Sequence, residues 1–467
     1  MNGEVEKEPQ LRRSMGVVGA TMVVVGGVIG SGIFLKPLGI ARSLPSEGWI
    51  HGCWIGLGVV CLLGALCYAE LGAMLPEAGG QYAFLRESFG RLPAFLYGWC
   101  LFLVINTGTI AALAVAFAKS LASVVPMTGA AYWSVAVGMI VLLAAVNHAG
   151  VGVGAGLQVA ATVAKIAMLA AIVIGGIAVV LGTEGASHGS GGAAMGAAVG
   201  EAAATASMAQ APGFASGLAA VGVAIFWAYE GWYQLPFSAA EMKRPEKTLP
   251  RGLLLGIGLL VALYVTVNAT YLALIPRQEM VGLVEEIDVP TTTMARIFGA
   301  TGARLLPLMI CLSVFGAANP NFLSTPRAFY AMARDGLVFP PLMAVDRRFR
   351  TPHVAIWAQA AWAVLLVVVL KTFRDITDYV VFASLLFYGL TAAGVVVLRR
   401  RRPDAPRPFR CPLVPLVPAL FIAVVLAVDV LTLADAANRR NALIGLAILA
   451  AGVPVYALAR RWSPKAT

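Results

Sequence analysis

Apolar runs of about 18 or more residues recur along the whole of this chain, and each is long enough to cross a bilayer. In hydrocarbon every backbone N–H and C=O must be satisfied within the protein, so such runs fold as helices. The composition agrees, because 59% of the 467 residues are hydrophobic and only 12% are charged, against about 25% charged in soluble domains. These features predict an all-α polytopic membrane protein.

Twelve transmembrane helices are expected, which places both termini on one side of the membrane. Their predicted ranges are 14–41, 49–75, 92–124, 130–147, 157–182, 214–240, 250–275, 303–333, 353–371, 375–398, 412–434 and 441–460. The remaining segments are an N-terminal tail (1–13), an Ala/Gly/Ser-rich external linker (183–213), a basic loop (399–411) that precedes the last two helices (412–460), and a C-terminal tail (461–467).

The basic residues indicate on which side the termini lie. Of the 34 Lys and Arg, 23 fall at one set of predicted helix ends, including "RRRR" at 399–402, and 9 fall at the other. Cytoplasmic loops carry such an excess, so we expect a multi-pass protein of the plasma (inner) membrane with both termini cytoplasmic. The same bias accounts for the net charge of +11, and no nucleic-acid partner is expected.

Two of the predicted helices are interrupted by residues that form helices poorly. Gly30-Ser31-Gly32 lies in "VVVGGVIGSGIFL" (23–35), and Glu230-Gly231 lies in "IFWAYEGWYQLPF" (225–237). Each break falls near the middle of the first helix of a five-helix block, and the two blocks start on opposite sides of the membrane. Paired breaks of this kind are typical of secondary transporters with a substrate site at the bilayer midplane. The pattern predicts two inverted repeats, 14–182 and 214–398.

The backbone at such a break carries its own binding chemistry. Amides at the start of the second half-helix favour a carboxylate, while carbonyls at the end of the first half-helix accept from an ammonium. Glycine permits the required conformations, and the Ser31 hydroxyl supplies a further hydrogen bond. One break would thus bind both charged ends of a zwitterion. The alternative is that Gly30-Ser31-Gly32 is only a patch of small residues that lets two helices pack closely.

Several motifs resemble a known family of transporters. They are "GGVIGSGIF" (26–34), "YAELGAMLPEAGGQYAFLRESFG" (68–90), "WAYEGW" (227–232), "EMKRPEKTLPRG" (241–252) and "STPRAFYAMARDGLVFP" (324–340). In this order and spacing they resemble the L-type amino acid transporter branch of the amino acid–polyamine–organocation superfamily. The resemblance implies the leucine-transporter-type fold: a five-plus-five inverted repeat with two extra helices, helices 1 and 6 unwound at mid-membrane, and alternating access.

The resemblance also implies a substrate site. Ser31 and Gly32, with Gly30 beside them, would bind the substrate carboxylate, and the α-ammonium would bind backbone carbonyls. Trp227 matches an aromatic gate, and Asn319 matches a polar position in helix 8. The carbonyls concerned are those of Val28, Trp227, Ala228 and Glu230.

Helix 3 departs from the family's usual pattern at "LVINTGTIAALA" (103–114). This departure puts in doubt any assignment of Val104, Ile105 or Thr109 to the pocket lining.

The cysteines argue against covalent partners. The six cysteines form no CxxC pair, so no metal site, cofactor or disulfide framework is expected. The predicted external loop between helices 3 and 4 contains no cysteine. The family's disulfide to a heavy chain therefore has no residue to form on, and none is expected.

Two charged residues lie inside predicted helices. Lys165 resembles the lysine that occupies the place of a second sodium ion in sodium-coupled relatives, which implies sodium independence; the alternative is a lysine that extends to the interface. Glu230 either contacts a cationic or polar substrate side chain, holds a proton, or only satisfies the interrupted backbone. Near the cytoplasmic side, Glu70 and Glu77 either form a gate with Arg86 or Arg327 or are simply solvated.

The preferred function is a sodium-independent amino-acid transporter, either an exchanger or a proton-coupled symporter. A second hypothesis is transport of cationic amino acids or polyamines through Glu230, and a third is a sensor or channel on the same scaffold. An enzyme is disfavoured, because no histidine lies at the depth of Ser31 and neither HExxH nor GxSxG is present. The amino-acid substrate and the lipid bilayer are the expected partners.

Overall fold

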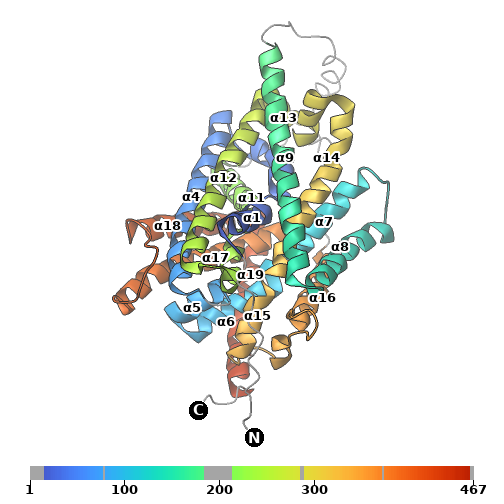
Figure 1. The fold of residues 1–467 in the computed structure, drawn as a ribbon. Helices are drawn as coiled ribbons and strands as arrows, with labels where there is room; N and C mark the ends of the chain where they lie inside the picture. Colours follow the sequence, from blue (N-terminus) through green and yellow to red (C-terminus); the bar gives the residue numbers. More distant parts are fainter. Residues whose placement is uncertain (1–14, 77–78, 184–212, 284–288, 371–372, 463–467) are drawn as a thin grey trace.

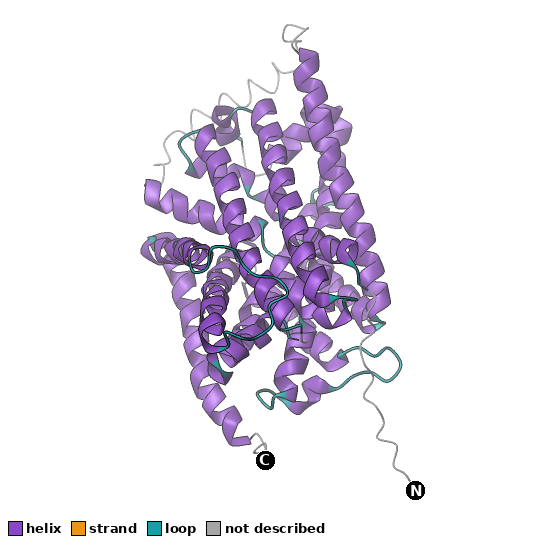
Figure 2. Cartoon of the chain, turned by 60° about the vertical axis from the view of Figure 1, so that its left-hand side comes forward, coloured by secondary structure: helices purple, strands orange, loops and turns teal. Residues whose placement is uncertain are grey.

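A computed structural model describes residues 15–76, 79–183, 213–283, 289–370 and 373–462 of the chain. Across these residues the regular structure is helical and contains no strand (Figure 2). The extended residue Met15 lies beside Met242, and this isolated bridge joins the start of the first helix to the segment after residue 241. The described part of the chain therefore confirms the all-α architecture.

Residues 15–183 form the first group of helices. In chain order they are α1 (Val17–Val28), α2 (Gly32–Leu35), α3 (Pro37–Ser43), α4 (Glu47–Met74), α5 (Gln81–Phe89), α6 (Arg91–Cys100), the π-helix η1 (Leu101–Ile105), α7 (Asn106–Ala122), α8 (Ala130–His148) and α9 (Val151–Thr183). Helices α6, η1 and α7 run on without a break, so they form one membrane-spanning segment.

Residues 213–462 form the second group. In chain order they are α11 (Phe214–Ala228), the 3₁₀-helix η2 (Trp232–Glu241), α12 (Pro245–Leu274), α13 (Arg277–Gly282), α14 (Val289–Leu323), α15 (Pro326–Arg334), the 3₁₀-helix η3 (Pro340–Met343), α16 (His353–Leu370), α17 (Phe373–Arg401), α18 (Leu416–Ala434) and α19 (Ala436–Trp462). Residues 184–212 of the predicted linker, the whole predicted N-terminal tail and the C-terminal tail after Trp462 lie outside the described residues.

Eleven of the described segments are at least 18 residues long and apolar enough to cross a membrane. The remaining predicted span, 353–371, corresponds to α16, whose apolar part, His353–Val369, is shorter. α14 consists of two helices that meet at a kink at Gly299, where φ is +65°. Only glycine adopts this conformation at little cost. The helix after the kink begins close to the predicted start of helix 8 at 303, and the predicted range to 333 is divided between this helix and α15.

The interrupted helix α1 lies at the centre of the bundle, with α9, α12, α14 and η2 around it (Figure 1). Glycines allow the close approach of α12 to α1. A Cβ at Gly252 would lie 2.6 Å from the Ala20 Cβ, and one at Gly256 would lie 2.6 Å from Val24 Cγ1. Small residues at such contacts let membrane helices pack closely, so α12 lies directly against α1 at Ala20 and Val24.

Ion pairs at one end of the bundle join segments from both halves of the chain. Arg86 on α5 binds Asp335 at 2.7 Å, and Arg402 after α17 binds Glu87 at 2.7 Å. These two ion pairs connect α5 to the residue after α15 and to the residue after α17. The residues concerned belong to the predicted cytoplasmic set, and the structure places them on one side.

The prediction that Glu70 pairs with Arg86 or Arg327 is wrong. The Glu70 carboxylate accepts two hydrogen bonds from Arg399, at 2.9 and 2.6 Å, and one from the Cys411 backbone N–H at 2.6 Å. Arg407 lies 3.4 Å away. These contacts anchor the loop after α17 to the end of α4. Arg86 and Arg327 have other partners, and Glu77 lies outside the described residues.

Candidate functional site

The first helix interruption lies between α1 and α2. α1 ends at Val28, Ile29 adopts φ −68° and ψ 92°, and α2 begins only at Gly32. α2 has four residues, but Lys36 after it keeps a right-handed helical conformation, and the Ile40 N–H donates to the Lys36 carbonyl at 3.0 Å. The half-helix after the break therefore continues through α3 to Ser43. Its first backbone amides lie at the positive end of the helix dipole.

The second interruption lies between α11 and η2. α11 ends at Ala228, and the chain turns through Tyr229, Glu230 and Gly231 before η2 begins. Gly231 has φ +119°, a conformation that residues with a side chain rarely adopt. η2 contains Pro236, which has no N–H to donate. This residue helps explain why the chain continues as a 3₁₀-helix and not as an α-helix.

Glycines bring the two interruptions into direct contact. A Cβ at Gly231 would lie 2.9 Å from the Gly27 carbonyl oxygen, and a Cβ at Gly32 would lie 2.4 Å from the Ala228 Cα. Neither position has room for a side chain. Close packing is thus one role of Gly32, and the two segments of exposed backbone face each other across a narrow gap.

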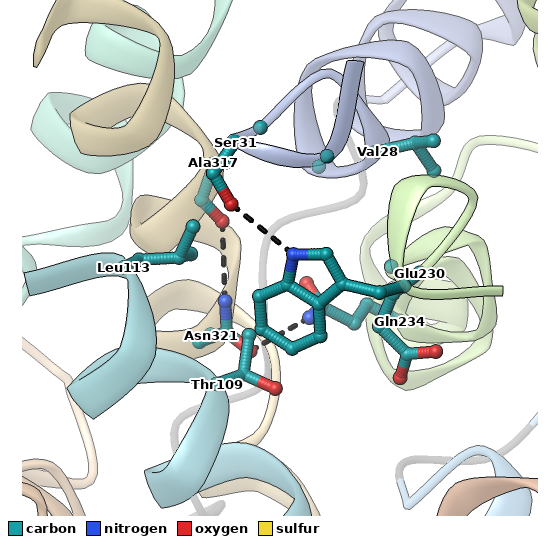
Figure 3. Close-up of a pocket in the computed structure, with 13 residues that line it drawn as sticks. Val28, Ser31, Thr109, Leu113, Glu230, Gln234, Ala317 and Asn321 are labelled. Atoms are coloured by element: carbon teal, nitrogen blue, oxygen red, sulfur yellow. Dashed lines mark hydrogen bonds between the residues drawn. The ribbon is translucent and has the colours of Figure 1, made fainter. Parts of the chain in front are cut away.

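A small cavity lies in this gap, between the interruptions and the helices α7 and α14 (Figure 3). Its free volume is about 20 Å³, which is room for one water molecule and too little for an amino acid. The lining residues are Gly27, Val28, Gly30, Ser31, Gly32, Thr109, Leu113, Trp227, Glu230, Gly231, Gln234, Ala317 and Asn321.

Most of the predicted binding residues meet at this cavity. Those that line it are Val28, Gly30, Ser31, Gly32, Trp227 and Glu230, whereas Ala228 and Asn319 are not among the lining residues. Of the positions in doubt on helix 3, Thr109 lines the cavity, while Val104 and Ile105 do not.

Asn319 is bound away from the cavity. It accepts from the Asn147 amide at 2.8 Å and donates to the Gly154 carbonyl at 2.9 Å and to Gln158 Oε1 at 3.1 Å. Asn321, two residues later, lines the cavity instead. Two residues correspond to about 200° around a helix, so the two asparagines of "ANPN" point in nearly opposite directions, and α14 presents the second one to the site.

Sequence reasoning missed the polar pair that Asn321 forms. Gln234 Nε2 donates to Asn321 Oδ1 at 2.8 Å, and both side chains are buried. Figure 3 shows them on facing walls of the cavity, with Thr109 and Leu113 on the same side as Asn321. Gln234 lies one helical turn after Glu230 in the sequence, and that spacing was the available signal.

The Trp227 side chain is hydrogen-bonded to the hydroxyl of Ser31. Its indole Nε1 donates to Ser31 Oγ at 3.1 Å, the upper dashed line in Figure 3. The edge of the indole also meets the Phe373 ring, with centroids 5.8 Å apart and planes at 85°. The indole therefore closes the cavity and uses the hydroxyl that the sequence assigned to a substrate carboxylate.

The Glu230 carboxylate turns toward α17. Its Oε1 accepts from Tyr388 Oη at 2.7 Å and from Ser384 Oγ at 3.3 Å. The residue is 7% exposed. Within the described part of the chain both recorded hydrogen-bond donors to this carboxylate are neutral hydroxyls. Glu230 is therefore a buried acidic group beside the cavity, available to a cation or a proton.

Lys165 binds the first interruption, which is the contact that its resemblance implied. Its Nζ donates to the Gly26 carbonyl at 2.8 Å and to the Ile29 carbonyl at 2.7 Å. Ser313 Oγ of α14 donates to the carbonyls of Ile29 and Gly30 at 3.3 and 3.1 Å. With an exposed fraction of 1%, Lys165 does not reach an interface. The alternative of a lysine extending to the membrane surface is wrong.

Side-chain contacts lie on both sides of the cavity along the bundle. On the side of α3, Lys36 Nζ lies 5.0 Å from the Phe373 ring centroid and donates to Thr377 Oγ1 at 3.2 Å. On the side where α1 begins, Arg327 forms a buried ion pair with Glu241.

The fold and the cavity together define a class of protein. Helices long and apolar enough to cross a membrane surround a cavity that lies at two helix interruptions. This is the arrangement of a secondary transporter.

The chain belongs to the amino acid permease family, whose model matches residues 15–453. It is 32% identical over 465 residues to the large neutral amino acids transporter small subunit 2 of Homo sapiens, covering 97% of this chain and 82% of that protein, and the same values hold for Mus musculus. It is 29% identical over 424 residues to the b(0,+)-type amino acid transporter 1 of Homo sapiens, covering 87% and 80%. These matches confirm the resemblance to the L-type branch, and they place the chain among transporters rather than enzymes.

Proposed function

We propose that this protein is a sodium-independent amino-acid transporter that works by alternating access, either as an exchanger or as a proton-coupled symporter. Membership of the amino acid permease family supports amino-acid transport. The single observation that carries the site is the contact of two helix interruptions around one cavity lined by Ser31 and Gly231. Polar backbone groups at membrane depth are tolerated where they line such a cavity.

The substrate carboxylate would bind Ser31 Oγ and the backbone amides of Gly30 to Gly32. The α-ammonium would bind carbonyl oxygens, but several of these already have donors. The Val28 carbonyl accepts from Tyr264 Oη at 3.1 Å, and the Trp227 carbonyl accepts from the Glu230 N–H at 3.1 Å. Because a carbonyl oxygen has two lone pairs, both can still accept from an ammonium. The Gly27 carbonyl, which faces Gly231, is a further acceptor.

Binding requires the Trp227 indole to move. The free volume of about 20 Å³ excludes an amino acid while the indole bonds to Ser31. The carboxylate would take over the Ser31 hydroxyl, and the released indole would move toward the side of Phe373. Substrate binding and the opening or closing of this gate are thereby linked through one hydroxyl group.

Lys165 supports independence from sodium. Its ammonium supplies a positive charge, fixed by covalent attachment, to the carbonyls of Gly26 and Ile29. A sodium ion at this place would coordinate the same type of oxygen ligand. The lysine would therefore hold the interruption in its binding geometry at any sodium concentration.

The second candidate function is transport of cationic amino acids or polyamines. The observation that favours it is Glu230, a buried carboxylate beside the cavity whose recorded donors are Ser384 and Tyr388. A cationic side chain would pair with this carboxylate in place of a proton. Glu230→Gln separates the two functions: lost selectivity for cationic substrates supports contact, and lost pH dependence with unchanged selectivity supports proton coupling.

The remaining proposals concern the cellular setting. We propose a plasma-membrane protein with both termini cytoplasmic, because the excess of Lys and Arg lies at that end. No disulfide-linked heavy chain is proposed, because the segment 123–129 between α7 and α8 contains no cysteine.

Counterflow in liposomes tests the function. Purified protein is reconstituted into vesicles loaded with one unlabelled amino acid, and uptake of the labelled amino acid is measured in sodium-free buffer with and without a pH gradient. The proposal predicts substrate-dependent uptake without sodium. Strict dependence on sodium would refute the assignment of Lys165. Uptake that needs no internal substrate, and whose rate does not saturate with the concentration of any amino acid, would indicate a channel.

A further inference from the structure

A second cavity lies on the other side of α7 from the substrate site. Its volume is about 180 Å³, compared with about 20 Å³ at the substrate site. It is enclosed by η1, α7, α16, α17 and α19, through residues that include Val104, Leu366, Ile376, Val380 and Ile444. Apart from Tyr379, every lining residue is aliphatic or glycine. The walls of this cavity offer an apolar ligand almost only hydrocarbon contacts.

The backbone explains why this space is not filled. η1 (Leu101–Ile105) is a π-helix. This wide helical turn is rare in proteins overall, and where it occurs it is often at a functional site. The Leu103 carbonyl in this turn accepts from Trp362 Nε1 at 3.0 Å, which holds α16 at that position. Gly108 lets α17 approach α7 closely, because a Cβ there would lie 2.7 Å from Val380 Cγ2.

The cavity opens toward the surface that faces lipid. Ile444 lines it and is 38% exposed, and the exposed residues next to it on α19 and α16 are apolar, with Leu443 at 52% and Leu365 at 45%. Ile444 comes eight residues after Ala436, the first residue of α19, which is about 12 Å along the helix axis. That depth lies within a hydrocarbon core about 30 Å thick.

We propose that an acyl chain of a membrane lipid enters between α16 and α19 and fills this cavity. An engineered apolar cavity of about 150 Å³ stays dry and binds benzene, so a cavity of this size and lining favours hydrocarbon over water. Lipid tails are the hydrocarbon in contact with its mouth at Ile444. The inference is independent of the proposed function, because it concerns a surface that the transported substrate does not touch.

Photolabelling of the full chain tests the proposal. The protein is reconstituted in nanodiscs of phosphatidylglycerol that carries a diazirine in one acyl chain, irradiated, digested and mapped by mass spectrometry. Val104, Ile376 and Val380 are 6%, 1% and 0% exposed, so lipid on the outer surface cannot reach them. Labels on these residues are the expected result. Labels confined to exposed residues such as Leu443 would overturn the proposal, because the acyl chain would then not enter the cavity.

Two adjacent pairs of residues provide matched variants. Ile444→Trp and Leu366→Trp place an indole in the cavity, whereas Leu443→Trp and Leu365→Trp place it on the lipid-facing side of the same helices. The cavity variants should reduce labelling of Val380 at least fivefold, and the controls should leave it unchanged. Equal labelling in all four variants would contradict entry of the chain between α16 and α19.

Discussion

Replacing Lys165 with methionine tests how the first helix interruption is held. The ammonium donates to the carbonyls of Gly26 and Ile29, at 2.8 and 2.7 Å, from a fully enclosed position on α9. Methionine is similar in length but has no donor. Ile29 would keep a hydrogen bond from Ser313 at 3.3 Å, whereas Gly26 would lose the donor that replaces the helical N–H of residue 30.

The expected size of the effect follows from that one carbonyl. A buried acceptor without a partner costs about 1–3 kcal/mol. If the interruption relieves this cost by leaving the binding geometry, the competent fraction falls by roughly 5- to 150-fold, and the apparent Kd rises by the same factor. Removal of the buried charge offsets part of the loss in folding stability, so affinity should change more than the melting temperature does.

The assay is equilibrium binding by purified protein of the amino acid with the fastest counterflow. Lys119→Met is the matched control, since Lys119 is exposed near the end of α7, and its Kd should equal that of the unmodified protein. Ser313→Ala is a milder second test of the same carbonyls. A Kd for Lys165→Met within twofold of the original, from protein that elutes as a single species, would refute the reasoning.

Three further predictions concern other positions. Gly32→Ala should abolish counterflow, because its Cβ would lie 2.4 Å from a Cα of α11, whereas Gly39→Ala, with no atom within 4 Å, should not; equal rates would contradict the need for close contact. Trp227→Phe removes the indole hydrogen bond and should lower the counterflow KM by roughly two- to tenfold; a higher KM would show that the indole assists binding. Asp346 accepts hydrogen bonds from the backbone, chiefly from the Phe349 N–H, which lower the pKa of its carboxyl. Its stabilisation is therefore present above the unfolded pKa of about 4 and is lost as pH falls through the lower folded value, so Asp346→Asn should flatten the acid decline of the melting temperature, and parallel declines would contradict this.

The features that the sequence predicted well are those that the bilayer itself constrains. Glycine and serine at mid-membrane conflict with a continuous helix, so the interruptions near Ser31 and Gly231 could be located from composition alone. A lysine inside an apolar run must find acceptors, and an interrupted helix offers free carbonyls. The contact of Lys165 with the end of α1 follows from these two requirements.

The features that were missed depend on contacts between distant segments. The two residues that donate to the Glu230 carboxylate, Ser384 and Tyr388, lie on α17, more than 150 residues away in sequence. In the sequence neither hydroxyl stands out from its neighbours. Glu70 had several arginines within the predicted cytoplasmic set, and only the packing of α17 against α4 selects Arg399. The family resemblance pointed to Asn319, but Asn321 suits a polar site equally well, and the rotation of α14 decides between them.

Competition by substrate analogues tests the central claim most directly, namely that the two interruptions bind the charged ends of an α-amino acid. For the best counterflow substrate, the methyl ester removes the carboxylate charge, and the N-acetyl derivative removes the ammonium. Both should fail to inhibit counterflow at concentrations where the parent amino acid saturates it. Inhibition by either derivative at the concentration of the parent would contradict binding at the interrupted backbone.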